Sequence, residues 1–169
     1  MKSLTVIESG VGIEGGVGHG PVPEHTGRPL LVVGVDGSSA SWDAFSWAAE
    51  QARRTEGLVI AVFAVPLSDP ELAMDFDVAL DYGAVEDARD EMAEELGCEV
   101  AKRAAELGVE VSFVREYGDA AGALARVSRS DHADAIVVGR SASTLERLAG
   151  SLGRRLVLSR DLPVVVVVP

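Results

Sequence analysis

The chain is poor in the residue types on which disulfide frameworks, metal sites and most catalytic centres depend. It has one cysteine, Cys98, and three histidines in 169 residues. A single cysteine excludes an internal disulfide and a cysteine-rich zinc site. His19 and His25 lie in a glycine-rich stretch, and His132 follows Asp131 in a predicted surface turn. No Walker-type G-x-x-x-x-G-K and no G-x-S-x-G nucleophile motif occurs, so the sequence gives no support to an enzyme.

Long apolar runs and an excess of positive charge are missing as well. No run approaches the roughly 20 apolar residues of a membrane span, and the N-terminal residues contain no apolar segment like that of a signal peptide. The formal net charge of -12 argues against binding to nucleic acid or to an anionic membrane surface. These features predict a cytoplasmic protein whose partners are neither nucleic acids nor membranes.

What the sequence does contain, from Pro29 onward, is an alternation of apolar runs and helical patterns. Apolar runs without polar interruption are typical of strands that are covered on both faces. Strands that alternate with helices predict right-handed crossovers and a parallel sheet in an α/β domain. The predicted strands cover residues 30–35, 58–65, 109–114, 135–138 and 164–168, and the predicted helices cover residues 39–55, 84–107, 118–130 and 144–158. The acidic residues 66–83 are expected to form a surface loop or lid.

Residues 1–28 differ from this pattern, because they are rich in glycine and contain two prolines. They predict a flexible arm attached to an α/β domain of residues 29–169. Gly10 to Gly15 match the dinucleotide-binding pattern G-x-G-x-x-G, but more glycines and two prolines follow them instead of a helix. We therefore favour the arm over a nucleotide site here. The alternation of Leu4 and Val6 leaves open that this part of the arm docks as an extra strand.

Candidate ligand-binding residues follow two of the predicted strands. Asp36 comes directly after the first strand, and Gly139 and Arg140 come at the end of the fourth. The carboxyl ends of parallel strands form the usual ligand crevice of such sheets, and the free N–H groups near Gly150 and Ser151 are suited to an anion. An alternative stays open for each residue: Asp36 can simply form the turn before the first helix, and the others can belong to a capped loop.

The ordered set of these motifs resembles the universal stress protein family over about residues 29–169. No single motif is specific, but their order along the chain is. The segments that carry the resemblance are Val33-Gly34-Val35-Asp36-Gly37-Ser38 with Ser41, Trp47-Ala48, Gly118-Asp119, Ala133-Asp134-Ala135-Ile136-Val137-Val138-Gly139, Gly150-Ser151 and Pro163 with the valines after it.

This resemblance implies a Rossmann-like five-stranded parallel sheet of order 3-2-1-4-5 with helices on both faces. It also implies a homodimer paired through the last strand, Val164–Val168. The ATP-binding branch of the family uses G-x-x-G-x9-G-[S/T] after the fourth strand, the aspartate after the first strand, and backbone at the end of the second. In this chain those positions are, in sequence order, Asp36, Val65, Gly139, Gly150 and Ser151.

The loop of this chain departs from the ATP-binding pattern in two ways. Ala142 stands where the pattern has its second glycine, and the segment up to Gly150 is two residues short. A Cβ at that position obstructs close approach of the backbone to a phosphate. The resemblance therefore favours a dimeric stress-response or regulatory module that acts by binding a client protein, without tight nucleotide binding. The alternative is a sensor that binds ATP with Mg²⁺ and at most hydrolyses it slowly. An enzyme that uses Asp36 and the serines is the weakest hypothesis.

Overall fold

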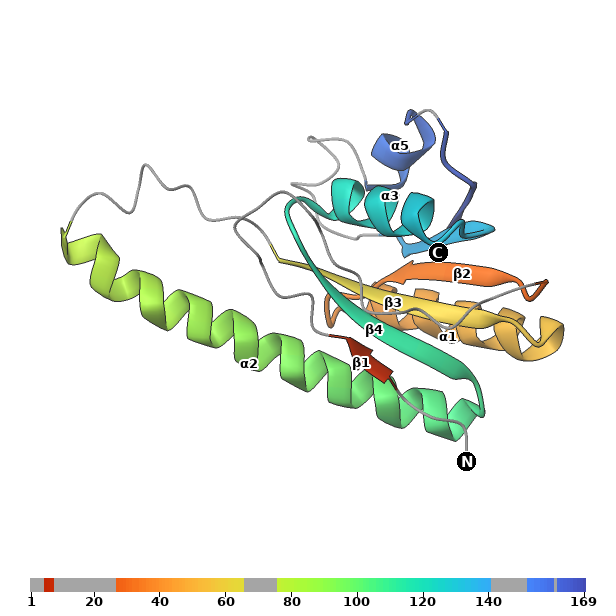
Figure 1. Cartoon of the computed structure of the whole chain (residues 1–169), viewed down its shortest axis with the longest axis horizontal. Helices are drawn as coiled ribbons and strands as arrows, with labels where there is room; N and C mark the ends of the chain where they lie inside the picture. Colours follow the sequence, from red (N-terminus) through yellow and green to blue (C-terminus); the bar gives the residue numbers. More distant parts are fainter. Residues whose placement is uncertain (1–4, 8–26, 66–75, 141–151, 160) are drawn as a thin grey trace.

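The structure is a computed structural model that describes residues 5–7, 27–65, 76–140, 152–159 and 161–169. Strands and helices alternate through most of the chain, as the sequence predicts (Figure 1). The strands are β1 (Thr5–Ile7), β2 (Leu30–Gly34), β3 (Leu58–Val65), β4 (Glu110–Tyr117), β5 (Ala135–Gly139) and β6 (Val164–Val168). The described helices are α1 (Ser39–Thr55), α2 (Phe76–Leu107), α3 (Ala120–Ser130) and α5 (Leu152–Val157).

The described strands form one parallel sheet of order β1-β4-β3-β2-β5-β6. Without β1, this is the predicted five-stranded order 3-2-1-4-5, so the fold prediction is confirmed. The additional strand lies inside the segment expected to be an arm, where Thr5–Ile7 pairs with Ser112–Val114 of β4. The Leu30 N–H, at the start of the central strand, donates to Asp134 Oδ2 at 2.8 Å across 104 positions of sequence.

The sheet separates two apolar layers because alternate side chains of each strand point to opposite faces. Leu31 and Val33 of β2 pack with α1 and α2 on one face, and Leu30 and Val32 pack with α3 and α5 on the other. Figure 1 shows α1 and α2 below the sheet and α3 and α5 above it. The central strands are buried on both faces, which explains their uninterrupted apolar sequence.

Helix α1 begins and ends where its sequence signals predict. Ser38 is its N-cap and accepts a hydrogen bond from the Ser41 N–H. The helix ends at Thr55, and its C-cap Glu56, with a φ of 53°, lies in the left-handed region directly before Gly57. An added Cβ on Gly57 would lie 2.5 Å from the Pro29 carbonyl oxygen, so the turn into β3 requires glycine there.

Two predicted boundaries are wrong. The loop expected over residues 66–83 is helical from Phe76, so α2 begins eight residues earlier than predicted and reaches 32 residues. The predicted strand 109–114 runs to Tyr117 as β4. Of the predicted helix 144–158, the structure describes α5 from Leu152, and the residues before it lie outside the described part of the chain.

Candidate functional site

A cavity opens at the carboxyl ends of β2, β3 and β5, where the first turns of α1 and α3 meet α5. Its volume is about 120 Å³. The lining combines the ends of the central strands with small and apolar side chains of the helices: Gly34, Val35, Asp36, Ala40, Ser41, Val62, Ala64, Ala120, Leu124, Val138, Gly139 and Leu152. The sequence predicted this location, because parallel strands place their carboxyl ends at one edge. It did not predict the helix residues, since small apolar side chains carry no signal of a binding role.

Asp36 and Gly139, two of the predicted site residues, both line this cavity. The Asp36 carboxylate belongs to the turn before α1, because its Oδ1 accepts the Ser38 N–H at 2.9 Å. Its own N–H donates to Ser41 Oγ at 3.3 Å, and the Ser41 hydroxyl donates to the Ser38 carbonyl at 2.9 Å. These bonds make Asp36 an organiser of the first turn of α1.

The ionisation of Asp36 reflects two opposing effects. Partial burial by itself raises the pKa of the carboxyl group, because it disfavours the charged form. Hydrogen bonds from Ser38 and Ser41 favour the charged form, and the net result is a pKa below the ordinary value. The cavity therefore has a carboxylate at its rim at neutral pH. This charge repels a bare phosphate and suits a hydroxyl group or a cation.

Gly139 has a packing requirement that is independent of any ligand. An ideal Cβ on this residue would lie 2.1 Å from the Ala40 carbonyl oxygen and 2.9 Å from the Ala40 Cβ. Helix α1 thus crosses the end of β5 at a distance that only glycine permits. A glycine at this position is explained by the contact between helix and strand, and it is no independent sign of a phosphate site.

The remaining predicted site residues lie elsewhere or outside the described residues. Arg140 is exposed, and its backbone N–H donates to the Val168 carbonyl at 2.8 Å, which holds β6 to the end of β5. Val65 has a buried side chain on the α1 and α2 face, and its carbonyl accepts the Gly118 N–H at 2.8 Å. Residues 141–151, which include Gly150 and Ser151, are outside the described residues.

An ion pair joins the two helices that close the other side of the cavity. Arg155 of α5 approaches Asp119 Oδ1 to 2.7 Å, and the residues Ala120 and Leu152 of the same helices line the cavity. Asp119 is the predicted N-cap of α3, and its side chain accepts the Gly122 N–H at 3.1 Å. That backbone hydrogen bond, with the nearby Arg155 charge, lowers the pKa of Asp119 against a smaller opposing effect of burial.

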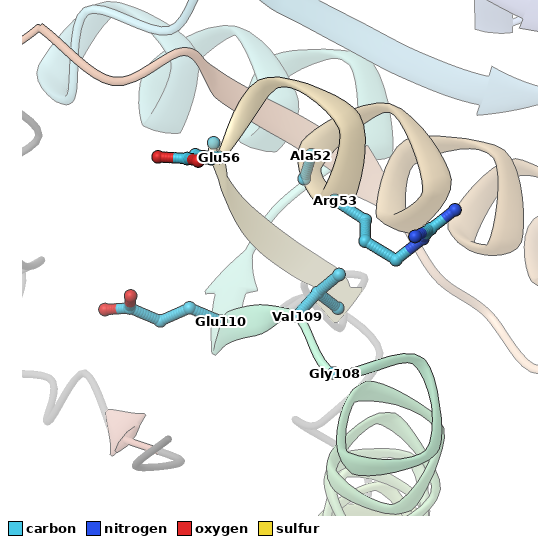
Figure 2. Close-up of a pocket in the computed structure, with 7 residues that line it drawn as sticks. Ala52, Arg53, Glu56, Gly108, Val109 and Glu110 are labelled. Carbon is cyan, nitrogen blue, oxygen red and sulfur yellow. The ribbon is translucent and has the colours of Figure 1, made fainter. Parts of the chain in front are cut away.

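A second, smaller cavity of about 60 Å³ lies at the opposite end of the sheet (Figure 2). Glu56 and Glu110 lie on one side of it and Arg53 on the other. Arg28 ties this end together, since it donates to the Glu56 carbonyl at 2.7 Å and to Glu110 Oε2 at 3.1 Å. The cavity has room for a few water molecules only. Its position at the ends of α1 and α2, where helix dipoles are negative, makes it unsuited to an anion.

Neither a metal centre nor a membrane span is found among the described residues. No group of three or more histidine, cysteine, aspartate or glutamate side chains is gathered there as metal ligands. No described helix is both long and apolar enough to cross a membrane. The candidate site lies at the strand ends of a doubly wound parallel sheet, an architecture typical of nucleotide-binding proteins.

Comparison with known proteins shows the family to which the chain belongs. Residues 30–168 match the universal stress protein family, and the chain belongs to this family. Family membership supports a role in the response to stress. No curated protein matches the chain in sequence.

Solved structures show the same fold at low sequence identity. A universal stress protein in complex with cAMP matches with a TM-score of 0.65 and 22% identity over 83% of this chain and 97% of its own. The universal stress protein UspA from Lactobacillus plantarum matches with a TM-score of 0.66 and 21% sequence identity, over 84% of this chain and 98% of its own. The universal stress protein from Archaeoglobus fulgidus in complex with dAMP matches with a TM-score of 0.55 and 19% sequence identity, over 84% of this chain and 98% of its own.

Proposed function

We propose that this protein is a dimeric stress-response or regulatory module that acts by binding a client protein, without tight nucleotide binding. The observation that carries the proposal is the exposed apolar edge of the sheet at β6. The chain has a single cysteine, Cys98, and so no internal disulfide, which fits the cytoplasmic location that forms part of the proposal.

The edge formed by β6 has the composition of an interface. Val164 and Val167 are 67% and 47% exposed, and Val157 and Leu158 at the end of α5 are 65% and 71% exposed. An apolar strand with one unpaired side is a template for association with another chain. A two-fold axis beside β6 would pair this strand with its copy in an isologous interface and cover the valines of both chains. Such pairing would give the homodimer through Val164–Val168 that the family resemblance implies.

Sedimentation velocity at micromolar concentration tests the proposed dimer. The wild-type protein is expected to sediment as a dimer. The variant Val164→Lys is expected to shift toward monomer, because each chain then brings a charge into the apolar interface without disturbing the buried core. We prefer it to Val166→Lys, since Val166 packs against the core. Val85→Lys, an exposed valine on α2, is the matched control and is expected to leave the dimer intact. A wild-type monomer would refute the proposal.

The geometry of the crevice supports the absence of tight nucleotide binding. Asp36 is engaged in the turn before α1, and Gly139 is required by the contact with Ala40. The cavity of about 120 Å³ is also smaller than the roughly 300 Å³ at which ligand pockets usually begin. The described residues thus offer space for only part of a nucleotide.

The alternative function is a sensor of ATP or a related adenine nucleotide, with Mg²⁺ as its cation. It is favoured by the position of the crevice and by related structures in complex with cAMP and dAMP. In this alternative Asp36, Val65, Gly139, Arg140, Gly150 and Ser151 would contact the nucleotide, and slow hydrolysis would be the most the site could catalyse.

Calorimetric titration with MgATP separates the two functions. Binding in the low micromolar range that is lost in Gly150→Val would support the sensor. No heat at millimolar ligand would support the interaction module. Equal binding by both proteins would place the ligand away from the predicted site. We expect weak binding or none.

A further inference from the structure

The edge of the sheet formed by β4 is covered by a strand much shorter than β4 itself. Strand β1 pairs in parallel with Ser112–Val114, in the middle of β4. On its other side β4 pairs with β3 over all eight of its residues, Glu110–Tyr117. Figure 1 shows β1 as a short arrow beside the longer β4. Among the described residues, the outer edge of β4 is thus paired at three of eight positions.

Three residue pairs hold β1 to the sheet only weakly. A backbone hydrogen bond adds little net stability, because the same groups bind water when the strand leaves, and parallel pairing is slightly weaker than antiparallel pairing. The five-stranded order of the remaining sheet is complete without β1. Strand β4 is held independently of it, by β3 and by buried side chains such as Phe113 and Val114. Strand β1 can therefore leave the edge while the rest of the sheet stays folded.

The connection from β1 to β2 does not force β1 to stay on the edge. The 22 residues 8–29 separate Ile7 from Leu30, and an extended chain of this length spans roughly 70 Å. In the sheet, β1 and β2 are separated by β4 and β3, a lateral distance of about 14 Å at the usual spacing of strands. The connection is much longer than this distance, so β1 can move away without displacing β2.

The length of β4 decides which strand could replace β1. A second copy of this chain would supply the same three residues, but without the advantage that covalent attachment gives to the chain's own β1. An extended segment of another protein that pairs with all eight residues of β4 would form more backbone hydrogen bonds than β1 does. Addition of a strand to a sheet edge is a common mode of peptide recognition. The edge therefore favours a longer strand from a different protein.

The side chains of β4 define the kind of segment that fits. Val111 and Phe113 belong to the apolar layer on one face of the sheet, and Val114 belongs to the layer on the other. Paired residues of neighbouring strands lie side by side on the same face. A strand docked here is therefore expected to be rich in apolar and β-branched residues. The chain's own Thr5-Val6-Ile7 consists of β-branched residues only.

From these observations we propose that the outer edge of β4 is a docking site for an extended, β-branched segment of a client protein. This segment would pair in parallel with β4 and displace β1, which occupies the site until the client binds. The proposal rests on the proposed function, because it specifies how the client is bound. It uses the edge of the sheet opposite to β6.

The test uses the full-length protein and a fluorescent peptide of ten residues. The probe consists of alternating threonine and valine with a lysine at each end. The control peptide has proline at its two central positions, and proline cannot donate the hydrogen bonds of a strand. Fluorescence anisotropy is expected to give at least tenfold tighter binding of the probe than of the control. Hydrogen exchange of residues 110–117 is expected to slow when the probe binds.

Variants of the N-terminal residues test the displacement of β1. Val6→Pro together with Ile7→Pro removes a donor that faces β4, because one of two adjacent residues in a strand directs its N–H to that neighbour. Without its competitor, the edge is expected to bind the probe at least fivefold more tightly. Val11→Pro together with Ile13→Pro adds two prolines outside β1, and this matched control is expected to bind the probe like the wild-type protein. Circular dichroism would verify that each variant is folded.

Several results would overturn the proposal. These are no binding of the probe at millimolar concentration, equal binding of both peptides, or an unchanged affinity in Val6→Pro with Ile7→Pro. Slower exchange at residues 164–168 instead of 110–117 would place the probe on the β6 edge. If the wild-type protein forms assemblies larger than a dimer and this variant loses them, a second copy occupies the site. The sedimentation of Val164→Lys concerns the opposite edge, so failure of this proposal and failure of the β6 dimer are distinguishable.

Discussion

The contact between Gly139 and Ala40 gives the sharpest stability prediction. In Gly139→Ala, the new Cβ would lie 2.1 Å from the Ala40 carbonyl oxygen, against the 3.0 Å below which real Cβ contacts essentially never occur. The atom in the way is backbone of α1, so a side-chain rotation cannot relieve the clash. Helix α1 or strand β5 must move by about 1 Å, and fully buried side chains such as Phe45 and Ala48 must move with them.

We expect this displacement to lower the free energy of unfolding by about 3 kcal/mol, the upper part of the range for overpacked cores. For a protein of this size the melting temperature should fall by roughly 6–12 °C. Urea unfolding followed by circular dichroism measures the first quantity, and a thermal melt measures the second. If the slope of the free energy of unfolding against urea concentration is unchanged, the variant and the wild-type protein expose the same surface on unfolding, and their free energies can be compared directly.

Gly34→Ala is the matched control at the same cavity. Its Cβ would lie 3.3 Å from Leu124 Cδ1, the end of a flexible side chain, so the expected cost is below about 1 kcal/mol. If Gly139→Ala is as stable as the wild-type protein, α1 does not cross β5 as closely as described. Gly139 would then again be a candidate for contact with a phosphate.

Two further predictions concern the ends of the sheet. Asp119→Ala should cost about 1 kcal/mol at neutral pH because α3 loses its cap to Gly122. Since the pKa of folded Asp119 lies below the ordinary 3.8, the part of its contribution that depends on its charge is fully present above that pH and is lost as the pH falls through the lowered value. Urea unfolding at pH values from 7 downward should show the difference between wild type and variant narrowing below pH 3.8, and a difference that grows as the pH falls would contradict this. Arg28→Ala should lower the free energy of unfolding by about 1–2 kcal/mol, because the Glu56 carbonyl and the Glu110 carboxylate lose their donor. Replacement of an exposed arginine such as Arg54 by alanine should lower it by less than about 0.5 kcal/mol, and thermal melts of both variants measure the difference.

Local signals in the sequence predicted most element boundaries. The Ser38 cap and the glycine at position 57 define α1, and Asp119 defines the start of α3, because each supplies a specific hydrogen bond or backbone conformation. The start of α2 was missed for a physical reason. Residues 76–83 contain Asp77, Asp81 and Gly83, which are weak helix formers. The acidic and irregular pattern of residues 66–83 therefore predicted a loop, yet the structure is helical from Phe76.

The candidate site was predictable in place but not in detail. Asp36 and Gly139 could be brought together from sequence alone, because both follow parallel strands. The sequence could not distinguish the two uses of glycine at position 139, since close helix packing and close approach of a phosphate both require the absence of a Cβ. Nor could it reveal that the Val65 carbonyl is engaged by Gly118, a contact that depends on the register of β3 and β4.

The hydrogen bond from Leu30 to Asp134 has a consequence for folding during synthesis on the ribosome. Strand β2 becomes the centre of the sheet, yet its second neighbour, β5, is synthesised about 100 residues later. At roughly 5–20 residues per second, one side of β2 stays unpaired for about 5–20 s after it emerges. During that interval the nascent chain exposes an apolar strand edge in a crowded cell. Translation rate and early chaperone contact should therefore influence the yield of folded protein.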